Sequence, residues 1–198
     1  MSESELIAVL ESEAGPKEKA DACRELAVVG TKEAVPALAA LLGDEKLSHM
    51  ARYGLETIPD PAVDDALRGA LGKLEGRPLV GAIASIGVRR DAKAAAPLAK
   101  LLRHSDADVA GAAARALGRI ATPEAVEAVK EALEKAPEEL RPAVADGCLG
   151  AAEALLAHDK RPEAAALYQL VSQADLPKHF RVAAAHGALS ARQPAANP

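Results

Sequence analysis

The chain has 198 residues, and hydrophobic residues make up 49% of it, which is enough for a continuous core. Only 2% of the residues are aromatic and none is tryptophan, so we expect no pocket that stacks nucleobases or grips a planar ligand. The formal net charge is −5, and no apolar run approaches the roughly 18 residues of a membrane-spanning helix. These totals favour helices packed through Ala, Leu and Val.

The chain opens with a predicted pair of helices. Ser2 and Glu5 have the spacing of a capping box, Gly15-Pro16 turns the chain, and Gly30 ends the second helix. The residues before Gly15 are acidic and lack the basic and apolar segments of a signal peptide, so we expect a cytoplasmic protein.

The same pattern recurs along the chain, with comparable turns at Thr31, Asp60, Asp91 and Thr122. Asp60 and Thr122 are each followed by proline, as expected for a helix N-cap and its first helical residue. A longer helix is predicted from about residue 138 to 158. The predicted repeats are approximately residues 2–30, 31–59, 60–90, 91–121, 122–160 and 161–192, and residues 193–198 are predicted to be a tail or linker.

The repeat at 91–121 has the clearest pattern. Its first half places Ala94, Leu98, Leu101 and Leu102 on one helical face. Ser105 is the predicted N-cap of its second helix. That helix again has one apolar face, formed by Val109, Ala112, Ala113, Ala116, Leu117 and Ile120. Neither helix could bury its face alone, which predicts a stack of helix pairs.

The segment 106–126, DADVAGAAARALGRIATPEAV, resembles HEAT repeats, including the short bacterial kind. The arginine that often follows the valine is replaced here by Ala110, whereas Arg141 and Arg181 keep it. Residues 152–171 also resemble a tetratricopeptide repeat. The resemblance implies an all-α fold, a right-handed α-α superhelix (α-solenoid) of about six helical hairpins, forming a single domain over residues 1–192 that serves as a protein–protein scaffold.

Charge is segregated along the chain. Residues 1–72 hold 7 basic and 14 acidic side chains, residues 73–119 hold 9 and 4, and residues 120–198 hold 8 and 11. Arg115 and Arg119 are four residues apart and share a helix face. The resemblance implies that second helices line a concave side. There we expect a basic surface for an acidic partner, or alternatively a solvated face partly neutralised by neighbouring aspartates. The predicted partner-binding residues are Arg115, Arg119, Arg89, Arg90, Arg77, His49, Arg52 and Arg181.

No residue pattern predicts a catalytic, cofactor or metal site. Cys23 and Cys148 are predicted to be small buried thiols, because they have no metal-type spacing. None of the five histidines is followed by glutamate, so the His-Glu dipeptides of deoxyhypusine hydroxylase, a HEAT-like di-iron enzyme, are absent. Ser85 does not lie in a Gly-x-Ser-x-Gly elbow.

We therefore expect a non-enzymatic, monomeric scaffold or adaptor that binds a protein or peptide, either as a whole protein or as a module excised from a larger one. One alternative is an auxiliary lyase or chaperone subunit resembling the HEAT-like bilin lyases. Another is a nucleic-acid-binding HEAT-like protein. The sequence pI of about 5.6 and the three aromatic residues argue against the last.

Overall fold

The computed structural model describes residues 1–193, in which twelve α-helices and two short 3₁₀ helices occur and no strand. The predicted all-α class is confirmed. The chain divides into two compact units, Met1–Arg89 and Arg90–Pro198. Among the described residues, no helix is both long and apolar enough to cross a bilayer.

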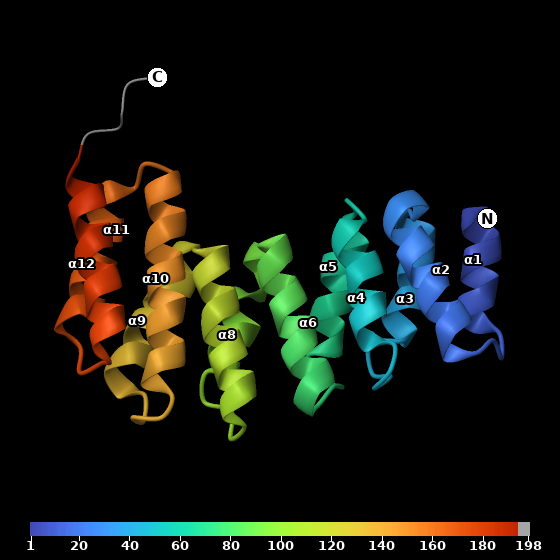
Figure 1. The fold of residues 1–198 in the computed structure, drawn as a ribbon, viewed down its shortest axis with the longest axis horizontal. Helices are drawn as coiled ribbons and strands as arrows, with labels where there is room; N and C mark the ends of the chain where they lie inside the picture. Colours follow the sequence, from blue (N-terminus) through green and yellow to red (C-terminus); the bar gives the residue numbers. More distant parts are fainter. Residues whose placement is uncertain (194–198) are drawn as a thin grey trace. The chain divides into compact units, whose positions relative to one another are not determined.

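The first unit consists of three helical hairpins in two layers (Figure 1). Its helices are α1 (Glu3–Glu11), α2 (Pro16–Val29), η1 (Lys32–Ala34), α3 (Val35–Ala40), α4 (Ser48–Thr57), α5 (Pro61–Ala70) and α6 (Gly76–Arg89). The first helices α1, α3 and α5 contact one another in sequence, and so do the second helices α2, α4 and α6. Leu26, Leu55 and Ile83, one from each second helix, are fully buried in the core of this unit.

The second unit repeats this arrangement, and its helices after α7 have 13 to 17 residues. They are η2 (Ala92–Ala94), α7 (Ala95–Leu101), α8 (Ala107–Ile120), α9 (Pro123–Lys135), α10 (Arg141–Ala157), α11 (Arg161–Gln173) and α12 (Lys178–Arg192). The second helices α8, α10 and α12 again lie side by side, with α10 in the middle (Figure 1). Leu98, Leu117 and Leu167 are buried between the two layers.

Most of the predicted helix boundaries are confirmed by cap geometry. Asp60 Oδ1 accepts a hydrogen bond from the Ala62 N–H at 2.8 Å, and Thr122 caps α9 through the Ala125 N–H. The capping box of Ser2 and Glu5 is present. That the six repeats form one continuous domain stays a prediction.

Two predicted helix starts are wrong. Asp106, not Ser105, is the N-cap of α8, because its Oδ1 accepts the Asp108 N–H at 2.8 Å while His104 Nδ1 accepts the Asp106 N–H. The long helix begins at Arg141 rather than near residue 138, because residues 138–140 form a turn. Of the predicted tail, residues 194–198 lie outside the described part.

Both cysteines are buried, as predicted, with Cys23 in α2 and Cys148 in α10. Loss of solvent raises the pKa of the Cys23 thiol to about 11 and that of Cys148 to about 12. The Cys148 Sγ also donates a hydrogen bond to the Val129 carbonyl at 3.5 Å. At neutral pH both thiols are therefore protonated and shielded.

We expect the native protein at pH 8 to react with Ellman's reagent only over hours, because the attacking species is an exposed thiolate. In 8 M urea the two thiols should react within minutes, and absorbance at 412 nm measures both rates. Fast reaction of one thiol without denaturant would contradict this prediction.

Candidate functional site

Arg115 and Arg119 share one face of α8, as predicted, and lie one turn apart on its exposed side. The rest of α8 is mostly interior, since 10 of its 14 residues are buried. Within residues 1–193, neither guanidinium has a hydrogen bond or ion pair to another side chain. Two arginines without a side-chain partner are thus held on a well-buried helix.

The close packing of α8 on α10 depends on glycine. A Cβ atom added to Gly118 would come closer than 3.0 Å to the Gly147 carbonyl oxygen, and one added to Gly147 would come equally close to the Ala114 oxygen. The two helix backbones therefore touch directly. This contact holds α8, and the two arginines on it, rigidly against α10.

The neighbouring second helices carry charge of both signs. Asp146 and Glu153 are exposed on α10, and Arg181 and His186 are exposed on α12. Because α10 lies between α8 and α12, Arg181 belongs to a different part of this surface from the α8 pair (Figure 1). The second unit therefore presents one localised cationic pair beside acidic neighbours.

The other predicted basic residues lie on other elements of the fold. His49 and Arg77 are exposed on α4 and in the first turn of α6, in the first unit. Arg90 is exposed at the start of the second unit, with a positive φ of 53°. Arg52 is half-buried on α4, and its guanidinium lies over Gly81 of α6, where its Nε has no hydrogen-bond partner.

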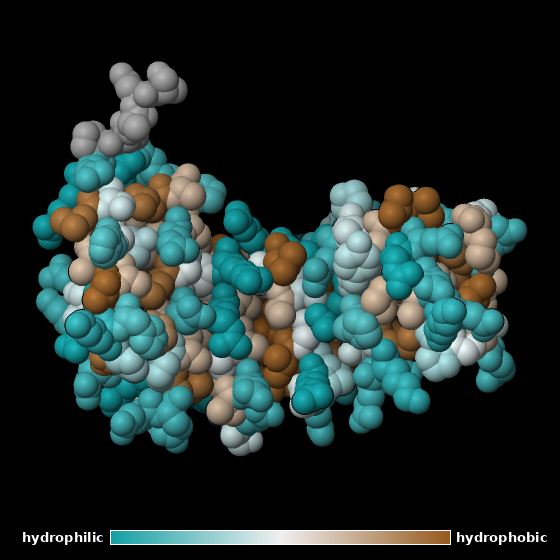
Figure 2. All heavy atoms as spheres, in the orientation of Figure 1, coloured by the Kyte–Doolittle hydropathy of each residue, from teal (hydrophilic) through white to brown (hydrophobic). Residues whose placement is uncertain are grey.

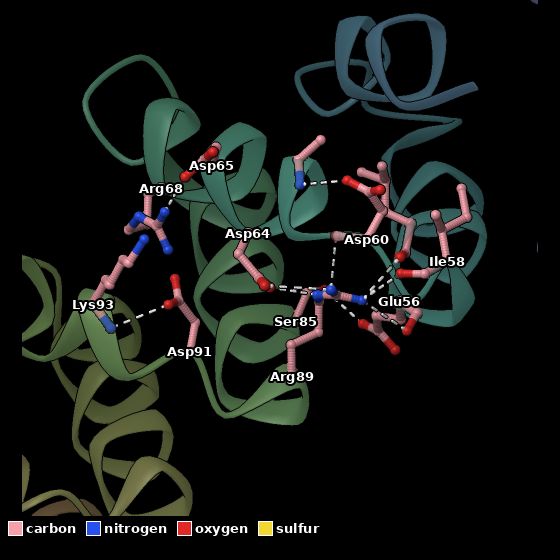
Figure 3. A network of polar contacts seen from close by, with 12 residues as sticks. Glu56, Ile58, Asp60, Asp64, Asp65, Arg68, Ser85, Arg89, Asp91 and Lys93 are labelled. Atoms are coloured by element: carbon pink, nitrogen blue, oxygen red, sulfur yellow. Dashed lines mark hydrogen bonds and ion pairs between the residues drawn. The ribbon is translucent and has the colours of Figure 1, made fainter. Parts of the chain in front are cut away.

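Arg89 corrects the predicted patch, because it is an internal structural residue. Its side chain is 12% exposed and forms an ion pair with Asp64 of α5. Its Nη1 donates to the Ile58 carbonyl at 2.8 Å, and its Nη2 donates to the Asp60 carbonyl at 3.1 Å (Figure 3). Arg89 thus satisfies carbonyls at the end of α4 and fixes that end to α5.

Ser85 is likewise a buried residue with an internal hydrogen-bond partner. It is fully buried on α6, and its Oγ donates to Glu56 Oε1 of α4 at 2.5 Å (Figure 3). A hydroxyl with this partner and no access to solvent is poorly placed to act as a nucleophile. The described residues also contain no group of three or more His, Cys, Asp or Glu side chains that could hold a metal ion.

The second helices of the first unit expose large apolar side chains as well as charged ones. Val28 on α2 is 84% exposed, and Tyr53 on α4 and Val88 on α6 are each 50% exposed. On the viewed side of the molecule, hydrophobic residues reach the surface between hydrophilic ones (Figure 2). The expectation of a mainly basic second-helix surface did not anticipate this apolar set.

A feature that the sequence analysis missed is a groove between α7 and α9, which we call the α7–α9 groove. It has a volume of about 570 Å³ and is bounded by Ala99–Leu102 on one side and Ala128–Ala136 on the other. The four-residue spacing of Ala128, Ala132 and Ala136 was the available signal. That spacing places Ala128 and Ala132 on one face of α9, with Ala136 directly after the end of the helix.

The comparisons agree with this fold. Residues 79–147 match the family of HEAT repeats. An engineered protein and a designed armadillo repeat protein in complex with the peptide (KR)4 are each 20% identical, with a TM-score of 0.52. The aligned regions cover 96% of this chain in both cases, and 96% and 98% of those chains. The chain therefore has the fold of α-helical repeat proteins, and its residues 79–147 are similar to HEAT repeats.

The complex of CpcE and CpcF of phycocyanin lyase from Nostoc sp. PCC7120 is a weaker likeness. It is 22% identical with a TM-score of 0.48, over 96% of this chain and 76% of that one. No curated protein sequence matches the chain.

Proposed function

We propose that this α-helical repeat chain, with its HEAT repeats, is a non-enzymatic adaptor that binds an acidic segment of a protein partner on the second-helix surface of its second unit. The observation that carries the proposal is the pair of exposed, unpaired guanidiniums of Arg115 and Arg119 on α8. Arginine forks suit carboxylates, and a rigid helix presents them without a backbone ordering cost on binding. The designed armadillo repeat protein in complex with a peptide supports this use of the fold.

The exposed apolar side chains of the first unit support a protein partner over a nucleic acid. Val28, Tyr53 and Val88 offer the kind of contact that protein interfaces use. Nucleic-acid binding instead relies on many cations that neutralise phosphates, and the α8 pair supplies two. A bilin lyase would need side chains that bind a tetrapyrrole, and we identify no such group among residues 1–193.

The test is affinity capture from cell lysate with the parent protein and with the variant Arg115→Glu, Arg119→Glu. A partner bound through carboxylates should be recovered at least about ten-fold less by this variant, because two attractions become repulsions. Recovery by the parent should also fall when salt is raised from 0.05 to 0.5 M.

The matched control is Lys178→Glu, Arg192→Glu, which makes the same charge change at exposed positions of α12 in the same unit. It should keep the partner, and both variants should keep the parent melting temperature. Equal recovery by all three proteins would refute the α8 site. Loss of the recovered partner after nuclease treatment would favour the nucleic-acid alternative instead.

A further inference from the structure

The α7–α9 groove has the size and lining of a small-molecule site. Its volume of about 570 Å³ falls within the range of roughly 300–1,000 Å³ that is usual for such sites. Leu102, Leu140 and Val144 contribute aliphatic surface, and no Phe, Tyr or Trp lines the groove. The lining therefore suits an alkyl chain better than a planar ring.

The α9 wall gives the groove its length. Ala128 and Ala132 of α9, and Ala136 directly after its last residue, follow one another at four-residue intervals along this wall. The eight-residue span corresponds to about 12 Å along a helix axis, the length of an extended alkyl chain of about ten carbons. Because alanine side chains are short, the wall leaves room for such a chain.

The rim of the groove is positively charged. Lys100, Arg103 and Lys135 line it together with one acidic residue, Glu131. The Glu131 carboxylate is held by Lys135 at 2.7 Å and lies 3.6 Å from Arg103. The hydrogen bond and charge of Lys135, followed by the charge of Arg103, lower the pKa of Glu131. Two of the rim cations, Lys135 and Arg103, thus already bind one carboxylate, that of Glu131.

We propose that the α7–α9 groove binds an aliphatic carboxylate of about ten carbons, with its tail along the α9 alanines and its head group at Lys100, Arg103 and Lys135. The head group would compete with Glu131 for the same cations. The groove opens between the first helices α7 and α9, with Val144 of α10 at its floor, and includes neither Arg115 nor Arg119, so it goes beyond the proposed function.

The test uses decanoate as the probe, with decylammonium and decanol as matched ten-carbon controls. In ¹H–¹⁵N spectra of the full chain at pH 7, decanoate should shift the amide signals of residues 99–104 and 128–136 in a saturable way. Decylammonium should shift them at least about five-fold more weakly, because it meets cations at the rim.

Two single substitutions should move the affinity for decanoate in opposite directions. Glu131→Gln removes the internal competitor and should tighten binding about two- to five-fold, whereas Arg103→Gln should weaken it by a similar factor. Ala132→Leu should abolish most of the binding by filling the groove. Lys130→Gln on the same helix is the control, because Lys130 pairs with Glu127 and does not line the groove, so binding should not change.

Each opposite result would overturn the proposal. Equal shifts with decylammonium would mean adsorption to apolar surface without charge recognition. An unchanged affinity in both Glu131→Gln and Arg103→Gln would remove the head-group site. An acidic amphipathic peptide that shifts these amides when decanoate does not would assign the groove to a protein partner.

Discussion

Replacing Gly118 with valine is expected to lower the free energy of unfolding by about 3 kcal/mol. The new Cβ would meet the carbonyl carbon and oxygen of Gly147 at distances that cannot be accommodated by rotating a side chain, because both atoms belong to the backbone. The helices α8 and α10 would have to separate, which would open the core of the second unit. Urea unfolding followed by far-UV circular dichroism measures the change.

Gly69→Ala is the matched control for this substitution. Gly69 is also helical, near the end of α5, but an added Cβ would meet nothing within 4 Å. Alanine is the better helix former, so this variant should gain up to about 1 kcal/mol. An unfolding midpoint for Gly118→Val at or above that of the parent would show that the two backbones do not touch as described.

Replacing Arg89 with methionine is expected to cost about 3 kcal/mol of unfolding free energy. The substitution leaves Asp64, which is 23% exposed, without its cation, and it leaves the carbonyls of Ile58 and Asp60 without the guanidinium donors. Methionine fills a similar volume, so the loss of unfolding free energy comes mainly from the missing polar contacts. Thermal and urea unfolding measure it.

Two further variants test whether the loss of stability comes from the polar contacts of Arg89. Arg77→Met, at an exposed position in the first turn of α6, should change stability by less than about 0.5 kcal/mol. Adding Asp64→Asn to Arg89→Met should recover part of the loss, because no buried charge then remains unpaired. A stable Arg89→Met protein that no longer captures a partner would instead support the original surface role of Arg89.

The repeat pattern was predictable because caps and apolar spacing are local properties. Asp60 with Pro61, and Thr122 with Pro123, fix helix starts through side-chain oxygens only a few residues from their targets. The shift from Ser105 to Asp106 marks the limit of such local reasoning. Both side chains can cap a helix, and the choice depends on His104 accepting the Asp106 N–H, which spacing alone does not specify.

The misassigned and missed features depend on residues from different helices. Arg89 was counted with the surface cations, since the sequence does not show that its guanidinium reaches the end of α4 from α6. The α7–α9 groove combines side chains from two repeats. Gly118 and Gly147 are 29 positions apart, and their significance comes from helix packing. By contrast, Arg115 and Arg119 were predictable because both lie on one helix face.

The two buried cysteines lie in different units, Cys23 in the first and Cys148 in the second. In a repeat protein, stability is approximately a sum of local terms and nearest-neighbour terms, so partial opening is a normal intermediate. A short pulse of thiol reagent during unfolding would therefore divide the molecules by mass into those with no, one or two labels. Peptide mapping of the singly labelled class would then identify the unit that opens first. The chain thus carries one thiol reporter of unfolding in each unit, with no substitution needed.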